Sequence, residues 1–337
     1  MSKKAGKQTV IFSLPPSLLA TAIIGGPMEA AGNISVYFDR VLEDNLLDYD
    51  SFEQCEAAML EWVVQKAAKK GAQTLDSIDY ILAGDLLNQL MSAHFANRTL
   101  QRPFIGIYGA CSSMVLTLAV GAMLLDGQFA DQVIAAVSSH HDAAERQYRF
   151  PTELGVQRPP VAQWTVTGAG AVLLAAKAVE KRPNIKAATI GKIIDAGVQD
   201  PNAMGAAMAP AAVDTMLQHF RDLNLTPSDY DHIFTGDLGK IGKALVIDMM
   251  AEAGYDVKGR YEDCGCLIYT EEQDTHSGAS GCASSAIVFG GPIYQELAAG
   301  RFKKVLIVGT GSLHSPTSYQ QKETIPCIAH AIAVAGI

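Results

Sequence analysis

Short apolar runs alternate with segments of helical character in the first half of the chain. Tyr80–Ala83, Phe104–Tyr108 and Val133–Val137 are brief apolar runs of the kind that form buried strands. Cys55–Lys69 has the apolar spacing of an amphipathic helix, and Cys111–Leu125 is a mostly apolar segment of helical length. Strands that alternate with helices predict parallel sheets covered by helices on both faces.

The second half of the chain shows the same kind of pattern. It predicts helices at Asp214–Leu223 and Cys282–Leu297 and strands at His232–Thr235 and Val305–Val308. At the start of the chain we expect a strand at Val10–Phe12 followed by a loop, because Pro15-Pro16 interrupts the apolar stretch. The lysines before this stretch also give it the outline of a signal peptide, which is the alternative interpretation.

Three short patterns recur in the same order in both halves, which indicates a duplicated unit. The matched positions are Gly84 and Gly236 (236 − 84 = 152), Cys111 and Cys282 (282 − 111 = 171), and Gly127 and Gly300 (300 − 127 = 173). The separation between matched positions grows by 171 − 152 = 19 residues from the first pair to the second, so the second half contains extra residues there. We assign these residues to a surface loop at 261–275. The duplication predicts two α/β halves, residues 1–180, which contain Cys111, and residues 181–337. The two halves are expected to pack together in five layers, in the order α/β/α/β/α.

Composition and charge exclude several classes of protein. The 337 residues include 26 Lys and Arg against 35 Asp and Glu, a net charge of −9, so a broad nucleic-acid surface is not expected. The sequence lacks an apolar stretch of the roughly 18–20 residues that a membrane span needs. The six cysteines show no disulfide framework, and Cys264-Gly265-Cys266 lacks a second ligand pair nearby, so we expect a reducing compartment and no metal or other cofactor.

Cys111 follows a predicted strand directly and opens a predicted helix. At a helix N-terminus, free N–H groups and the helix dipole favour a thiolate, which is the arrangement of an activated nucleophile. The alternative is a small buried residue at a tight turn between a strand and a helix. The spacing alone leaves both interpretations open.

Several blocks of the sequence resemble a known family. The two-fold repeat with a cysteine at the first strand-to-helix turn resembles the thiolase superfamily, which includes the ketoacyl synthases. Longer blocks resemble the stage V sporulation protein AD (SpoVAD) family of spore-forming bacteria within that superfamily. These blocks are 83–89, 109–112, 144–153, 165–168, 206–212, 321–323 and 325–330.

The resemblance implies a subunit of the SpoVA complex, which moves dipicolinic acid with calcium into the developing spore, and it implies direct binding of dipicolinic acid. It also implies a protein held at the spore inner membrane by other SpoVA subunits, with roles in transport and germination. A homodimer is the expectation for a member of the superfamily.

The same resemblance bears on catalysis. Condensing enzymes of the superfamily use a histidine in the second half to activate the thiol. Here the corresponding strand end reads Thr235-Gly236-Asp237, so an acid stands where the base is expected. We therefore expect a non-catalytic protein that retains its pocket. The alternative is an acyltransferase that acts on acyl-CoA with Cys111 as nucleophile, assisted by His276, His314 or His330.

Candidate ligand-binding residues follow from the predicted strand ends and helix starts. They are Asp85, Asn88, Cys111, Ser138, Ser139, His140, Arg149 and Cys282. Helix starts at the two cysteines offer N–H donors to carboxylates, and an arginine suits them by its forked geometry. Asp85 has a structural alternative, which is to cap the following helix. Met204–Ala212 is either an apolar pocket wall or a well-packed helix.

Overall fold

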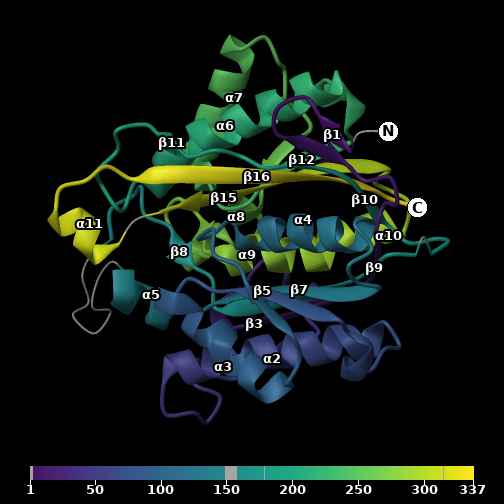
Figure 1. Cartoon of the computed structure of the whole chain (residues 1–337). Coiled ribbons are helices and arrows are strands. Elements are labelled where there is room, and N and C mark those ends of the chain that lie inside the picture. The colour runs from purple at the N-terminus through teal and green to yellow at the C-terminus, as the bar shows by residue number, and fades with distance from the viewer. Residues whose placement is uncertain (1–2, 149–157, 178, 314) are drawn as a thin grey trace.

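The computed structural model describes residues 3–148, 158–177, 179–313 and 315–337 and arranges them in five layers (Figure 1). Helices α6 and α7 form one outer layer, α2 and α3 form the other, and α4 and α9 lie between two sheets. The predicted five-layer arrangement is confirmed. These helices are α2 (Phe52–Lys70), α3 (Met91–Leu100), α4 (Ser113–Asp126), α6 (Met204–Leu223), α7 (Gly239–Glu252) and α9 (Cys282–Val288).

The two sheets repeat one order of strands. It is β6-β5-β7-β9-β3 in the first sheet and β13-β12-β15-β16-β10 in the second, and the sheets meet where β3 pairs briefly with β10. The first-sheet strands are β3 (Ser17–Gly25), β5 (Tyr80–Gly84), β6 (Phe104–Gly106), β7 (Gln132–Ser139) and β9 (Gly168–Ala175). The second-sheet strands are β10 (Asn184–Thr189), β12 (His232–Thr235), β13 (Tyr261–Asp263), β15 (Lys304–Ser312) and β16 (Pro326–Ala335).

The sheets are mixed, so the expectation of purely parallel sheets is wrong. Strands β5, β6 and β7 run parallel, but β9 is antiparallel to both β7 and β3. In the second sheet β16 is antiparallel to both β15 and β10 in the same way. The carboxyl ends of the parallel strands β5 and β7 still carry predicted candidates, which are Asp85 after β5 and Ser138, Ser139 and His140 at the end of β7. The predicted division at residues 180 and 181 falls between β9 and β10 and stays a prediction.

Shorter elements complete the fold. The short strands are β1 (Lys4–Ala5), β2 (Thr9–Ile11), β4 (Arg40–Val41), β8 (Trp164–Thr165), β11 (Ile194–Asp195) and β14 (Ala279–Ser280). The short helices are α1 (Pro27–Ala30), α5 (His141–Tyr148), α8 (Cys264–Leu267), α10 (Tyr294–Ala298) and α11 (Pro316–Gln320), with a π-helix at Phe289–Ile293. Single 3-10 turns lie at Ser35–Tyr37, Leu75–Ser77, Asn88–Leu90, Pro227–Asp229 and Glu271–Gln273.

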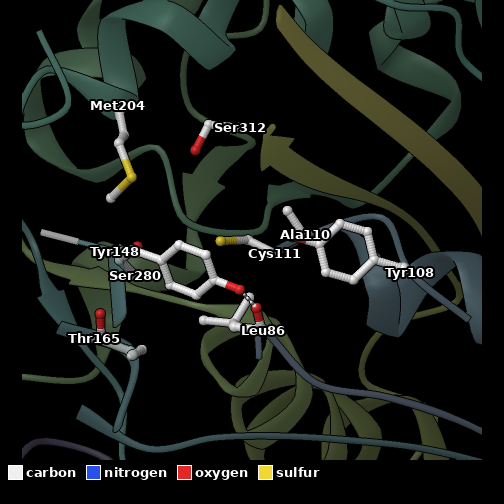
Figure 2. Close-up of a pocket in the computed structure, with 10 residues that line it drawn as sticks. Leu86, Tyr108, Ala110, Cys111, Tyr148, Thr165, Met204, Ser280 and Ser312 are labelled. Carbon is white, nitrogen blue, oxygen red and sulfur yellow. Dashed lines mark hydrogen bonds between the residues drawn. The ribbon is translucent and has the colours of Figure 1, made fainter. Parts of the chain in front are cut away.

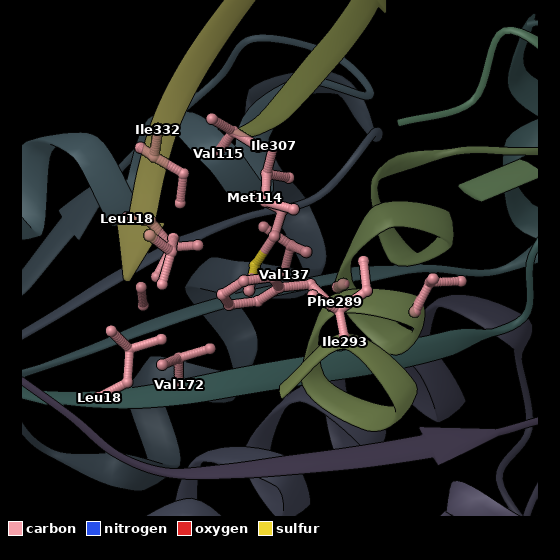
Figure 3. Close-up of a cluster of buried hydrophobic side chains, with 14 of the residues drawn as sticks. Leu18, Met114, Val115, Leu118, Val137, Val172, Phe289, Ile293, Ile307 and Ile332 are labelled. Atoms are coloured by element: carbon pink, nitrogen blue, oxygen red, sulfur yellow. The ribbon is translucent and has the colours of Figure 1, made fainter. Parts of the chain in front are cut away.

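The central layer is apolar because α4 packs against both sheets (Figure 3). Leu118 of α4 is fully buried, and it shares one cluster with Val137 and Val172 of the first sheet and Ile307 and Ile332 of the second. A helix that is apolar all round belongs in the interior, which is where the sequence of α4 directs it. This packing holds the residues before α4 at the junction of the two sheets.

The expected strand at the chain start is present as β2, and the expected loop follows it up to Pro15-Pro16. The nine-residue strand β3 after the prolines was not predicted. One predicted boundary in the second half is wrong. Helix α6 starts at Met204 and not at Asp214, and it contains Pro210. Pro210 lies beyond the first turn, where it has no N–H to donate to the carbonyl oxygen of residue 206, but the neighbouring alanines pack into the core and hold the helix together.

The segment 261–275 is only partly the predicted surface loop. Its first three residues form the edge strand β13, which pairs in parallel with β12. Asp263 at the end of this strand is fully buried, and it accepts hydrogen bonds from the Leu238 and Gly239 N–H groups, each at 2.9 Å. Burial raises the pKa of Asp263 to about 7.

Candidate functional site

Cys111 lies in a tight turn between β6 and α4. The residue before it, Ala110, has a positive φ of 49°, which is rare for a residue with a side chain and marks a sharp change of chain direction. Helix α4 begins at Ser113, two residues later than predicted, because Ser112 and Ser113 N–H groups first close the turn onto Gly109 and Ala110. The turn presents the cysteine side chain, which is 6% exposed, ahead of the helix.

The second sheet contacts this turn closely through β15. A Cβ atom at Gly311 would lie 2.3 Å from the carbonyl oxygen of Gly109, so only glycine fits at that position. The close approach brings residues from both halves of the chain to Cys111. The site is therefore built across the junction of the two sheets.

Asp237 follows β12 and receives a hydrogen bond from the thiol of Cys111. Its carboxylate also accepts the Thr310 hydroxyl at 2.8 Å and the Gly281 N–H at 2.9 Å. Complete burial raises the pKa of Asp237 to about 6, against the effect of these hydrogen bonds. A carboxylate thus stands beside the cysteine at the position where the resemblance led us to expect a base.

Cys282 begins α9 and lies fully buried beneath the site. Its thiol donates to the carbonyl oxygen of Ser138 at 2.8 Å. Burial raises the pKa of Cys282 well above its ordinary value, and proximity to Cys111 adds to the rise. Cys282 is therefore a neutral thiol, and its hydrogen bond to Ser138 connects the start of α9 to the carboxyl end of β7.

The three histidines considered as bases are not placed beside the thiol by the described contacts. His330 accepts the Gly191 N–H at 3.3 Å, and burial lowers its pKa to about 4. His276 lies 3.6 Å from a carboxylate oxygen of Asp274. His314 lies outside the described residues.

A small pocket opens beside the Cys111 sulfur, which points toward Met204 and the ring of Tyr148 (Figure 2). The volume of the pocket that the centre of a water molecule can occupy is about 40 Å³. A six-membered ring therefore enters the pocket only if side chains of its wall move. The lining residues are Leu86, Tyr108, Ala110, Cys111, Ala144, Tyr148, Thr165, Met204, Ser280 and Ser312. None of these described lining residues carries a positive charge.

Two tyrosines give the pocket its aromatic character. The Tyr148 hydroxyl donates to the carbonyl oxygen of Leu86 and also bonds with Tyr108. Burial raises the pKa of Tyr108 to about 12, so this phenol keeps its proton and remains a donor. Sequence reasoning did not single out either tyrosine, although Tyr108 lies three residues before Cys111 and Tyr148 directly precedes the candidate Arg149. Only the spacing to Cys111 could have pointed to Tyr108.

Of the eight predicted binding residues, Cys111 lines this pocket and Cys282 lies beneath it. Asp85 accepts the Leu87 and Ala93 N–H groups, each at 2.7 Å, and burial raises its pKa to about 6. Asp85 thus organises the turn before α3 in the way the capping alternative describes. Asn88 is exposed, with its side-chain oxygen 3.4 Å from the Tyr148 hydroxyl.

The candidates at the end of β7 form contacts elsewhere. Ser138 donates to Glu56 at 3.0 Å, and Ser139 donates to the carbonyl oxygen of Val166 at 2.7 Å. His140 places Nε2 2.8 Å from the carbonyl oxygen of Asn45. Arg149 lies outside the described residues. Strand position indicated the right neighbourhood for these residues, but not the direction of their side chains.

The remaining predictions concern metals and membranes. Within residues 3–148, 158–177, 179–313 and 315–337, no group of three or more His, Cys, Asp or Glu side chains is placed to hold a metal ion. Over the same residues, none of the helices combines the length and apolar character needed to span a bilayer.

Comparison with known proteins identifies the family of the chain. The family model for stage V sporulation protein AD (SpoVAD) matches residues 6–335. Stage V sporulation protein AD of Bacillus subtilis (strain 168) is 46% identical over 330 residues, covering 98% of this chain and 97% of that protein.

Solved structures support the same fold. A Glu-to-Gln variant of OleA from Xanthomonas campestris aligns with a TM-score of 0.64 and 14% identity, covering 96% of this chain and 99% of that one. 3-Oxoacyl-[acyl-carrier-protein] synthase III from Aquifex aeolicus VF5 aligns with a TM-score of 0.58 and 10% identity, covering 95% and 99%. The chain therefore belongs to the stage V sporulation protein AD (SpoVAD) family of sporulation proteins and has a thiolase-like fold.

Proposed function

We propose that the pocket beside Cys111 binds dipicolinic acid without acyl transfer, as one step in the uptake of this ligand into the developing spore by a SpoVA complex. The observation that carries the proposal is the buried carboxylate of Asp237, which accepts the hydrogen bond of the Cys111 thiol. A carboxylate beside a thiol disfavours the thiolate by repulsion between like charges. The thiol is then part of a pocket wall and does not act as a nucleophile.

The pocket lining suits a planar ring with polar substituents. Tyr108, Tyr148 and Met204 offer apolar surface, and the hydroxyls of Ser280 and Ser312 offer hydrogen bonds. Because the described lining lacks a cation, the two carboxylates of dipicolinate must be met by hydroxyl donors or by an accompanying calcium ion. Binding is therefore best measured both with and without calcium.

The acyltransferase alternative has the fold and the cysteine in its favour. It also requires a base that removes the proton of the Cys111 thiol. In the described surroundings of Cys111, the group in that position is Asp237, whose negative charge disfavours the thiolate. Attachment to the spore inner membrane through other SpoVA subunits remains part of the proposal, and the uptake step requires it.

Titration calorimetry with dipicolinate, with and without equimolar calcium, is expected to show saturable binding to the wild-type protein. Cys111→Phe fills the pocket with a larger side chain and is expected to weaken binding at least about tenfold, since the pocket has little spare room. Cys266→Phe is the matched control, because Cys266 is only partly buried and does not line the pocket. Equal binding by both variants, or no heat with the wild-type protein, would contradict the proposal.

A further inference from the structure

A groove lies between α2 and α3. These two helices form the outer layer of the first half (Figure 1). About 490 Å³ of the groove is open to the centre of a water molecule, against about 40 Å³ in the Cys111 pocket. Three alanines, Ala57, Ala58 and Ala96, line the groove, so the two helices leave space for a third element to approach closely.

Large apolar side chains stand along the walls of this groove. Tyr49, Met91 and Phe95 line it and are 46%, 41% and 45% exposed. The guanidinium carbon of Arg98 lies 4.7 Å from the centre of the Phe95 ring. Aromatic and methionine side chains that remain exposed around a concave surface are typical anchors of a protein interface.

One side of the groove is strongly acidic. From residue 43 to residue 61 the chain has no Lys or Arg, and its acidic residues outside the core are Glu43, Asp44, Asp48, Asp50, Glu53 and Glu61. Asp48 and Asp50 are exposed and flank Tyr49, while Glu53 and Glu61 line the groove itself. Among the ion pairs of the described residues, only the pair between Glu53 and Arg146 neutralises a member of this set.

We propose that the α2–α3 groove is the docking site for an amphipathic helix of a partner protein, with apolar side chains in the groove and Lys or Arg residues facing the acidic side. A helix that lays its apolar face into a groove between two helices is a common mode of recognition. Complementary charge along one edge fixes the orientation of the helix and excludes other partners.

The charge of the groove argues against its other possible occupants. In a two-fold contact between two copies of this chain, the same acidic segment would face itself, and each copy carries a net charge of −9. An anionic membrane surface would repel the acidic segment, because such surfaces attract basic clusters. A basic helix from a different chain meets neither obstacle. The inference does not depend on which ligand the Cys111 pocket takes.

The test uses a fluorescent synthetic helix with leucines on one face and lysines on the other, followed by anisotropy. The wild-type protein is expected to bind it saturably, and Phe95→Ala is expected to weaken binding about tenfold, because the anchor ring is lost. Phe129→Ala is the matched control, since Phe129 is 72% exposed and does not line the groove. A photoreactive residue on the leucine face is expected to cross-link to α2 or α3.

Three results would overturn the proposal. The first is equal binding by Phe95→Ala and Phe129→Ala, which would indicate a general attraction between the lysines and an acidic protein. The second is equal binding of a scrambled peptide of the same composition, which lacks an apolar face. The third is a dimer of the protein alone that Phe95→Ala dissociates and Phe129→Ala does not, which would assign the groove to a second copy.

Discussion

Replacing Asp237 with Asn is expected to raise the rate at which iodoacetamide alkylates Cys111 about tenfold at neutral pH. The pKa of Asp237, raised by burial to about 6, leaves this carboxylate largely ionised at neutral pH. A neighbouring negative charge disfavours the thiolate, which is the form that reacts. Asn keeps the shape of the side chain and its acceptor oxygen but removes the charge. Mass spectrometry of the peptide that contains Cys111 measures the rate.

Urea-unfolded protein provides the reference, because Asp237 no longer lies beside the thiol there and Cys111 should react at the same rate in the wild-type protein and the variant. An unchanged rate at Cys111 would mean that Asp237 does not restrain the thiol. An acyl adduct on Cys111 of the wild-type protein after incubation with acetyl-CoA would also contradict the account, provided that Cys111→Ala abolishes it.

Glu29→Gln is expected to make the protein more stable near neutral pH, although Glu29 is a well-placed buried residue. Its carboxylate accepts the Thr167 N–H at 3.0 Å and the Tyr269 hydroxyl, while no residue in the described part of the chain forms a hydrogen bond with the oxygen Oε2. Burial raises the pKa of Glu29 from 4.5 to about 7. The folded chain therefore holds the proton more tightly than the unfolded chain does.

The sign of the pH dependence follows from that difference. The stabilisation by the protonated carboxyl is complete below pH 4.5 and is lost as the pH rises through about 7. The loss amounts to about 3 kcal/mol, since one pH unit corresponds to about 1.4 kcal/mol. Gln resembles the protonated carboxyl at every pH, so the variant should match the wild-type protein near about pH 4 and exceed it by about 3 kcal/mol near about pH 8.

Urea unfolding at both pH values measures this difference. Glu296→Gln is the control, because the hydrogen bond from Arg301 lowers the pKa of Glu296. That carboxylate stabilises the fold above its unfolded pKa, so the Glu296→Gln variant should lose stability at the higher pH and not gain it. A Glu29→Gln difference that does not change with pH would show that Glu29 is ionised in the folded protein throughout this range.

The sequence contained enough information to predict the layers and most of the central elements. Helix α2 and strands β5, β7 and β12 lie within a few residues of their predicted positions, because their apolar spacing is regular. The duplication also predicted that Cys111 and Cys282 start equivalent turns. The weak points were strand β3, which was not predicted after Pro15-Pro16, and the start of α6, where packing overrides Pro210.

The candidate site was harder to predict than the fold. Strand ends indicated the neighbourhood of Ser139 and His140, but a shift of one residue along a strand turns a side chain to the opposite face. Tyr148 and Ser312 reach the pocket from segments far apart in the sequence, so their proximity depends on how the two sheets meet. Asp237 was predictable, because the resemblance to condensing enzymes marked its position.

A crystal structure of the protein soaked with dipicolinate distinguishes a ligand site beside Cys111 from an acyl-transfer site. The ligand is expected beside the Cys111 sulfur, with its ring against Tyr108 or Tyr148 and with Asp237 still hydrogen-bonded to the thiol. Dipicolinate bound elsewhere with this pocket unchanged, or a pocket in which a histidine has replaced Asp237 as the partner of the thiol, would contradict this expectation.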